Sequence, residues 1–136
     1  MKRVILFLIL VIFSGSVAAE WIKVDKTVGS TMYADKTTIS KNEDGSMVTL
    51  WRMDDFIRSQ VNKGKNRLSL KIQYEYDCKN VQLRVLAFSW YSDQMGEGEI
   101  VYSNAEPSPE EMPIMPDSFD EKFWKIACGK DSTTTY

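Results

Sequence analysis

Histidine is absent from this 136-residue chain, and cysteine, proline and glycine are scarce. Without histidine the chain has no imidazole metal site, no histidine-activated nucleophile and no base of the usual neutral-pH kind. The sequence also carries no glycine-rich phosphate loop and no nucleophile signature. These absences predict a protein that is not an enzyme and that uses no cofactor or metal.

An excess of one charge sign is missing as well. The formal net charge is −2 and the pI about 5.2, so no global field would attract nucleic acid, and we expect no nucleic-acid partner. With 43% hydrophobic and 26% charged residues the composition is that of a globular protein, and the length fits one domain.

The longest apolar run extends from Val4 to Phe13, after Lys2 and Arg3, and a stretch of small residues then ends at Ala19. This order is typical of a secretory signal peptide, since ten apolar residues cannot cross about 30 Å of hydrocarbon. We therefore expect a signal peptide over residues 1–19, a domain over 20–128 and a flexible tail over 129–136. Cleavage would leave 15 basic residues (17 minus Lys2 and Arg3) against 19 acids, a net charge of −4.

Export determines how the two cysteines are interpreted. Because an oxidising compartment favours disulfides, Cys78 and Cys128 are predicted to form one. No cysteine lies near the expected cleavage site, so the mature chain is not predicted to be a lipoprotein, and no other run reaches transmembrane length. The expected location is the periplasm, with the outer surface or secretion as alternatives.

Residues 68–78 alternate between apolar and polar side chains and are predicted to form a strand with one buried face. A turn at Lys79-Asn80 would lead into a second strand over residues 81–92. The opposite face then sets Glu75 against Arg84, an opposite-charge pair that supports the register. The predicted register pairs Cys78 with Val81, Tyr76 with Leu83, Tyr74 with Val85 and Ile72 with Ala87.

Short strands are predicted over residues 21–24 and 31–34, a longer one over residues 46–54 after an Asp44-Gly45 turn signal, and a sixth over residues 99–102. The four prolines fall in residues 106–116, which should have no regular structure.

One helix follows the prolines. Ser118 with Glu121 is a capping-box signature, and Gly129 ends the pattern. Its apolar stripe is Phe119, Phe123, Ile126 and Ala127. A bond between its end at Cys128 and the apolar face at Cys78 would hold the helix on that face. The predicted fold is α+β: an antiparallel sheet of about six strands, with one C-terminal helix packed on one face and tethered by the disulfide.

An ordered series of landmarks resembles the surface-adhesin protein E family of Gram-negative bacteria. The landmarks are Trp21, Tyr33-Ala34-Asp35, Ile39, the strand from Val48 to Trp51, Tyr76-Asp77-Cys78, Arg84-Val85-Leu86, Tyr91-Ser92, Val101-Tyr102-Ser103, Pro116-Asp117-Ser118 and Cys128. The resemblance implies a six-stranded sheet, a helix fastened by a disulfide and a secreted or cell-surface setting. It also implies adhesion, because the founding member is an outer-membrane lipoprotein that binds host matrix proteins.

The charges are unevenly distributed. A basic loop is predicted as a ligand-binding surface for an acidic protein, glycan or lipid head group; the alternative is a solvated loop that faces an acidic linker. The basic loop consists of Arg58, Lys63, Lys65, Arg67 and Lys71. The acidic segment, residues 93–121, holds Asp93, Glu97, Glu99, Glu106, Glu110, Glu111, Asp117, Asp120 and Glu121.

In the predicted register Leu86, Phe88 and Trp90 lie on the face opposite the core and form an outer strip. Such a strip predicts a protein interface, and we expect a homodimer. A β-bulge after Ala87 is the alternative, because it would turn these residues inward.

The function expected from the sequence is that of an exported, non-enzymatic binding module, with a macromolecule of the envelope or the cell exterior as its partner. The alternative is a periplasmic structural or assembly protein that docks to an envelope partner.

Overall fold

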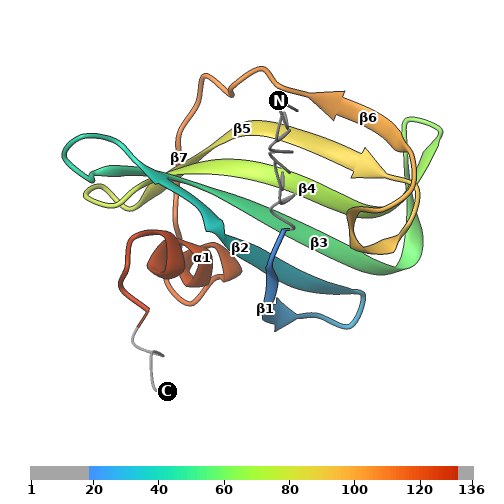
Figure 1. Ribbon diagram of the computed structural model, residues 1–136, viewed down its shortest axis with the longest axis horizontal. Helices are drawn as coiled ribbons and strands as arrows, with labels where there is room; N and C mark the ends of the chain where they lie inside the picture. Colours follow the sequence, from blue (N-terminus) through green and yellow to red (C-terminus); the bar gives the residue numbers. More distant parts are fainter. Residues whose placement is uncertain (1–18, 132–136) are drawn as a thin grey trace, which may run out of the picture.

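The computed structural model describes residues 19–131, so residues 1–18 of the predicted signal peptide and residues 132–136 of the predicted tail lie outside them. Strands β1 to β6 follow one another across one antiparallel sheet in chain order, and a short seventh strand pairs with β5 (Figure 1). The predicted fold class is confirmed. The elements are β1 (Trp21–Lys26), β2 (Ser30–Lys41), β3 (Met47–Asn62), β4 (Lys65–Asp77), β5 (Gln82–Tyr91), a 3-10 turn η1 (Gln94–Gly96), β6 (Ile100–Asn104), β7 (Met112–Pro113) and α1 (Phe119–Ala127).

Strands β3 and β4 are longer than the sequence pattern predicted and join in a two-residue turn at Lys63 and Gly64. Both turn residues have positive φ, 53° and 74°. Such a conformation matches the twist of a tight hairpin and favours glycine. As a result, the basic part of the chain lies on a long hairpin.

The hairpin of β4 and β5 keeps the predicted register over its first half only. Tyr76 pairs with Leu83, Tyr74 with Val85 and Glu75 with Arg84, and the last pair forms an ion pair of 2.7 Å. The ladder starts at Asp77 and Gln82, so Cys78 and Val81 belong to the turn.

A bulge then shifts the register by one residue: Gln73 pairs with Ala87 and Ile72 with Phe88. The predicted pair of Ile72 and Ala87 is therefore wrong. Leu86 is the extra residue on β5, because Tyr74 and Gln73 are consecutive whereas Val85 and Ala87 are not.

The proline-rich segment contains a strand that the sequence did not predict. Met112 and Pro113 of β7 pair with Leu83 and Gln82 at the outer edge of β5. Ile114 follows, is buried in the core and donates its backbone N–H to the carbonyl of Val81 at 3.0 Å. Pairing at a sheet edge tolerates the missing N–H of proline, which explains why this segment can form a strand.

Helix α1 begins as predicted, with the Ser118 hydroxyl accepting a hydrogen bond from the backbone N–H of Glu121 at 3.2 Å. Phe123, Trp124 and Ala127 are its buried residues. Phe119 was predicted to face the core but is 41% exposed. Trp124 takes a core position that the predicted stripe did not include, and its indole Nε1–H donates to the backbone carbonyl of Asp77 at 3.0 Å.

The predicted disulfide between Cys78 and Cys128 is present, with Cα atoms 5.7 Å apart. It holds the end of α1 against the turn between β4 and β5. Under the helix lies the core, which combines residues of the central strands with Phe123, Trp124 and Ala127. The strand residues of this core include Val48, Leu50, Tyr76 and Leu83.

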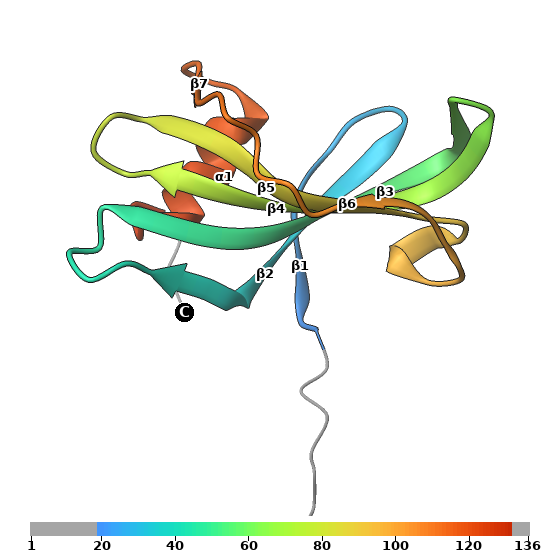
Figure 2. The same ribbon diagram turned by 90° about the horizontal axis from the view of Figure 1, so that it is seen from above.

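Helix α1 packs against one face of the sheet, at the end away from the β3–β4 hairpin (Figure 2). We call this side the helix-side face. Since side chains alternate along a strand, Arg52 and Asp54 on β3 share it with Val48 and Leu50, and their partners on β4 are Ile72 and Leu70. Among the described residues, no helix is long and apolar enough to span a membrane.

Loss of the disulfide should destabilise the domain strongly. It closes a loop with a sequence separation of 50 residues, and in the chain-entropy model its removal costs about 4 kcal/mol. Urea unfolding of Cys78→Ala/Cys128→Ala should therefore show a much lower midpoint than the oxidised protein. Reductant should lower the midpoint of the native sequence and leave that of the double variant unchanged; equal midpoints for the two oxidised proteins would contradict the prediction.

Candidate functional site

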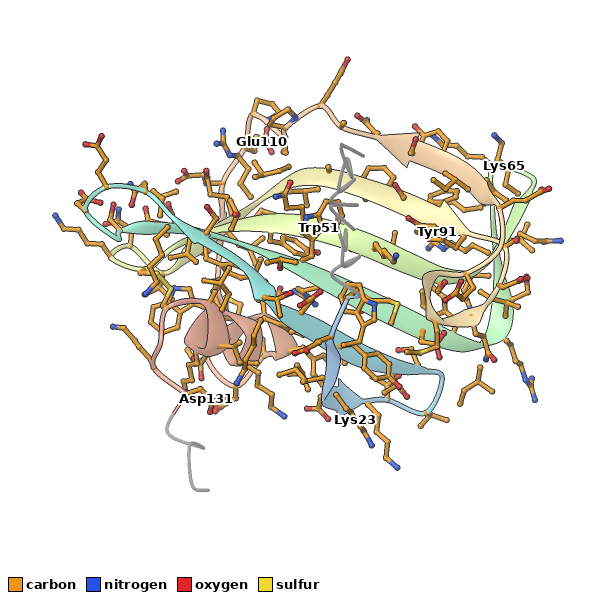
Figure 3. All side chains as sticks on the ribbon, viewed as in Figure 1. Lys23, Trp51, Lys65, Tyr91, Glu110 and Asp131 are labelled. Atoms are coloured by element: carbon orange, nitrogen blue, oxygen red, sulfur yellow. A yellow bond between two sulfur atoms is a disulfide. The ribbon has the colours of Figure 1, made fainter. Side chains whose placement is uncertain are left out.

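The structure divides the predicted basic loop among three places. Arg58 is exposed on β3, beside Ile57 and the turn between β1 and β2. Lys71 lies on the other face of the sheet, because its β4 neighbour Ile72 is on the helix-side face. Lys63, Lys65 and Arg67 remain together at the outer end of the β3–β4 hairpin, where Figure 3 labels Lys65. We call these three residues the hairpin cations.

Arg67 packs on aromatic rings. Its guanidinium carbon lies 4.3 Å from the centroid of the Trp90 ring and 5.6 Å from that of Phe56. Burial lowers the pKa of Arg67, against the opposing effect of Asp54, and its Nε is buried with no hydrogen-bond partner among the described residues. The part of the guanidinium that stays exposed can bind an anionic acceptor.

Lys63 and Lys65 lie beside the next ring. Their ammonium groups are 6.0 and 5.7 Å from the centroid of Tyr102, and Lys65 Nζ donates to the backbone carbonyl of Val101 at 3.1 Å. Tyr102 in turn packs on Trp90, with ring centroids 4.9 Å apart. The hairpin cations therefore border an aromatic cluster formed by Phe88, Trp90 and Tyr102.

The outer strip does not exist as predicted. Because of the bulge at Leu86, Phe88 and Trp90 pair with Ile72 and Leu70 and lie on the helix-side face. Trp90 is only 6% exposed. The structure shows the predicted alternative, a β-bulge, one residue earlier in β5 than expected. The interface role of Leu86, Phe88 and Trp90 stays a prediction, and so does the homodimer. Both were based on an outward-facing strip that the structure does not contain.

Next to the aromatic cluster the helix-side face is hollowed. The hollow has a volume of about 540 Å³ and lies beyond the part of the sheet that α1 covers. Three strands form its floor, and the segment after β6 forms one wall. We call it the apolar hollow; its lining consists of Leu70, Ile72, Val85, Phe88, Trp90, Asn104, Glu106, Pro107, Ser108 and Pro109.

A family model described as surface-adhesin protein E matches residues 21–129. The chain belongs to the surface-adhesin protein E family. Surface adhesins act by binding outside the cytoplasm, so membership makes this chain an adhesin-like binding protein of the exported kind. No curated protein matches the chain.

Solved structures of Haemophilus influenzae protein E share the fold. Crystal form II of that protein has a TM-score of 0.66 and 16% sequence identity, over 84% of this chain and 91% of that one. A second structure has a TM-score of 0.64 and 16% identity, over 89% and 92% of the two chains. Protein E from non-typeable Haemophilus influenzae has a TM-score of 0.58 and 17% identity, over 85% and 79%.

The acidic segment of this adhesin E chain does not pair with its basic loop. Among the described residues, the ion pairs of Asp120 and Glu121 are made with Arg52 and Lys125, and no ion pair joins the segment to the hairpin cations. The two segments do touch where Lys65 Nζ donates to the carbonyl of Val101, but that contact is not an ion pair, so the described residues show no direct pairing of their charges.

A buried charge cluster on β3 was missed by sequence reasoning. Arg52 is 5% exposed, binds Asp120 at 2.7 Å and lies 3.7 Å from the centroid of Phe123 and 4.7 Å from that of Tyr74. It thereby fastens α1 to the middle of the sheet. Beside it, burial raises the pKa of the Asp54 carboxyl, although Arg52 and Arg67 act in the opposite direction.

The opposite face carries a smaller slot of about 280 Å³. Trp21, Trp51 and Tyr91 line it together with Lys71, and Figure 3 labels Trp51 and Tyr91 over the central strands. The Lys71 ammonium lies 4.8 Å from the centroid of Tyr91 and 5.7 Å from that of Trp21. The alternation of side chains on β3 predicts that Trp51 lies on this face. The positions of Trp21 on β1 and Tyr91 on β5 beside it could not be predicted without the order of the strands in the sheet.

Neither region offers a metal centre: the described residues contain no group of three or more cysteine, aspartate or glutamate side chains able to hold an ion.

Asp54→Asn should stabilise the folded protein at pH 7, because the amide has no charge to bury. The pKa of Asp54 is raised in the folded state, so the native protein should gain stability as the pH falls through that pKa toward the unfolded value near 3.8. In urea unfolding measured from pH 7 to pH 4, the midpoint of Asp54→Asn should therefore rise less than that of the native protein.

Glu43→Gln, at an exposed turn, serves as the control, since it removes one carboxylate without relieving burial. A less stable Asp54→Asn at pH 7 would show that attraction to Arg52 and Arg67 outweighs the burial of the carboxylate.

Proposed function

We propose that this adhesin E family member is an exported, non-enzymatic binding module that holds an acidic macromolecule of the envelope or the cell exterior on its hairpin cations. The signal-peptide pattern supports export, with the periplasm as the first location. The absence of histidine and of nucleophile signatures from the sequence supports binding rather than catalysis.

The observation that carries the proposal is the state of the hairpin cations. None of the ion pairs among residues 19–131 involves Lys63, Lys65 or Arg67. Their positive charges are therefore not neutralised by direct pairing within the described part of the chain, and they stand on a hairpin that projects from the sheet (Figure 2). Clustered cations on a projection attract acidic surfaces and accelerate encounter.

Aromatic contacts make these cations better binders than free surface lysines. Stacking on Trp90 restricts the Arg67 guanidinium, and the carbonyl of Val101 restricts the Lys65 ammonium. A restricted side chain loses less conformational entropy when it binds a carboxylate, sulfate or phosphate group. The proposed partner is therefore recognised by dense negative charge, as in an acidic glycan or an acidic protein segment.

Replacing the three hairpin cations by serine should weaken binding to a polyanion in a salt-dependent way. On a heparin column the Lys63→Ser/Lys65→Ser/Arg67→Ser variant should elute at clearly lower salt than the native protein. The matched control is Lys36→Ser/Lys41→Ser/Lys79→Ser, which makes the same change in net charge at three exposed lysines away from the β3–β4 hairpin turn. Equal retention of native protein and hairpin variant would remove the proposal; so would an equal loss in the control.

The cellular location decides whether the binding module acts in the periplasm or on the outer surface. An adhesin on the outer surface should be labelled on intact cells by a membrane-impermeant lysine reagent, since its exposed lysines are accessible there. A periplasmic protein should remain unlabelled on intact cells and should be released by osmotic shock. Because the periplasm is the proposed location, we expect release without labelling; labelling of intact cells would place the protein at the surface.

A further inference from the structure

The apolar hollow is a binding site that the proposed contact with acidic macromolecules leaves unexplained. Helix α1 covers the helix-side face over Val48, Leu50 and Tyr76, whereas Leu70 and Ile72 on the same face line the hollow. A volume of about 540 Å³ is within the range of small-molecule sites.

The lining defines the chemistry of an occupant. Leu70, Ile72 and Val85 are aliphatic, Phe88 and Trp90 are aromatic, and two prolines form the outer wall. Burying a hydrocarbon group against such a surface is favourable by about 0.8 kcal/mol per methylene. The polar lining residues, Asn104, Glu106 and Ser108, belong to the segment at the edge of β5. The occupant that fits therefore has an apolar body.

The pairing of β5 argues against an extended peptide as that occupant. Peptides that join a sheet need a free strand edge. Within the described residues β7 pairs with the start of β5, β6 pairs with its end, and the carbonyl of Val85 between them accepts the backbone N–H of Ser108 at 2.8 Å. A flexible hydrocarbon chain needs no such edge, because it has no backbone hydrogen bonds to satisfy.

Charge is placed unevenly around the hollow. Trp90 lines it and also carries the Arg67 guanidinium, 4.3 Å from the ring centroid, with a buried Nε that has no partner among the described residues. Asn104 pairs with Phe88, so Glu106 lies farther along toward Val85. An anionic group is therefore favoured at the Trp90 end and disfavoured at the Glu106 end.

We propose that the apolar hollow binds the acyl chain of an anionic amphiphile. The chain lies against Leu70, Ile72 and Phe88, and the anionic head group meets Arg67 beyond Trp90. This site goes beyond the proposed function: it shares Arg67 with the hairpin cations, but the apolar hollow gives it a separate ligand and separate variants.

The test is a titration of the exported chain with single-chain amphiphiles below their micelle concentrations, followed by tryptophan fluorescence and by isothermal calorimetry. Dodecanoate should bind saturably at one site. Its affinity should fall about fourfold for each methylene removed, so that hexanoate does not bind measurably. Dodecyltrimethylammonium, with the same chain and a cationic head, should bind at least about tenfold more weakly than dodecanoate.

Variants separate the head-group contact from the chain contact. Arg67→Gln should weaken dodecanoate about tenfold and leave neutral dodecanol unchanged, whereas the matched change Arg58→Gln on the same hairpin should affect neither. Ile72→Asn should weaken both amphiphiles. If circular dichroism shows that Ile72→Asn does not fold, Ser108→Phe, which narrows the hollow from a surface segment, takes its place.

Cross-tests distinguish this proposal from the one on acidic macromolecules. Ile72→Asn or Ser108→Phe should lose dodecanoate and keep heparin retention, while Lys63→Ser should weaken heparin retention and keep dodecanoate. The amphiphile proposal is overturned by the absence of saturable dodecanoate binding, by equal affinity for the anionic and cationic head groups, or by dodecanoate binding that survives both changes in the hollow. Retention of an extended peptide by the hollow in place of dodecanoate would equally overturn it.

Discussion

The attachment of α1 to one end of the sheet determines the layout of the rest of the molecule. The Cys78–Cys128 bond holds the end of the helix, the Trp124 indole binds the carbonyl of Asp77, and Arg52 binds Asp120 near the helix start. These contacts hold both ends of α1 in place, so they determine which strand positions the helix covers. The core forms beneath it, and the remaining length of the helix-side face is left for the apolar hollow.

The bulge at Leu86 has the next largest effect, because one extra residue moves Phe88 and Trp90 to the helix-side face. There they meet Tyr102 of β6 and the cations of the β3–β4 hairpin. Apolar area and positive charge thus lie next to each other although they come from three hairpins. Both proposed ligands, an acidic macromolecule and an anionic amphiphile, depend on this juxtaposition, the first mainly on charge and the second mainly on the apolar hollow.

Local signals in the sequence were sufficient for much of the fold. The strand over residues 68–77, the Glu75 and Arg84 pair and the Ser118 cap each involve neighbours in sequence or a single hairpin, and each was confirmed. The predicted polar face of that strand is in part buried, since Ser69 and Asp77 are 0% and 8% exposed. The bulge was predicted only as an alternative, one residue too late, because Leu86 and Ala87 fit the strand pattern equally well in either register. Contacts between distant segments, such as Arg67 on Trp90, β7 on β5 and Arg52 under α1, have no local signature in the sequence. The sequence therefore identified residues of the candidate site but not their arrangement in space.

The order of the strands has a consequence for how the chain folds. From β1 to β6 each strand pairs with its neighbour in sequence, so the loops that close are short and the entropic cost of each step is small. Docking of α1 is different, since Cys128 must find Cys78 across 50 residues. The six strands can therefore pair before the two cysteines meet, and the disulfide then forms on a sheet that already exists. In kinetic terms the bond acts late: it should slow unfolding far more than it speeds folding.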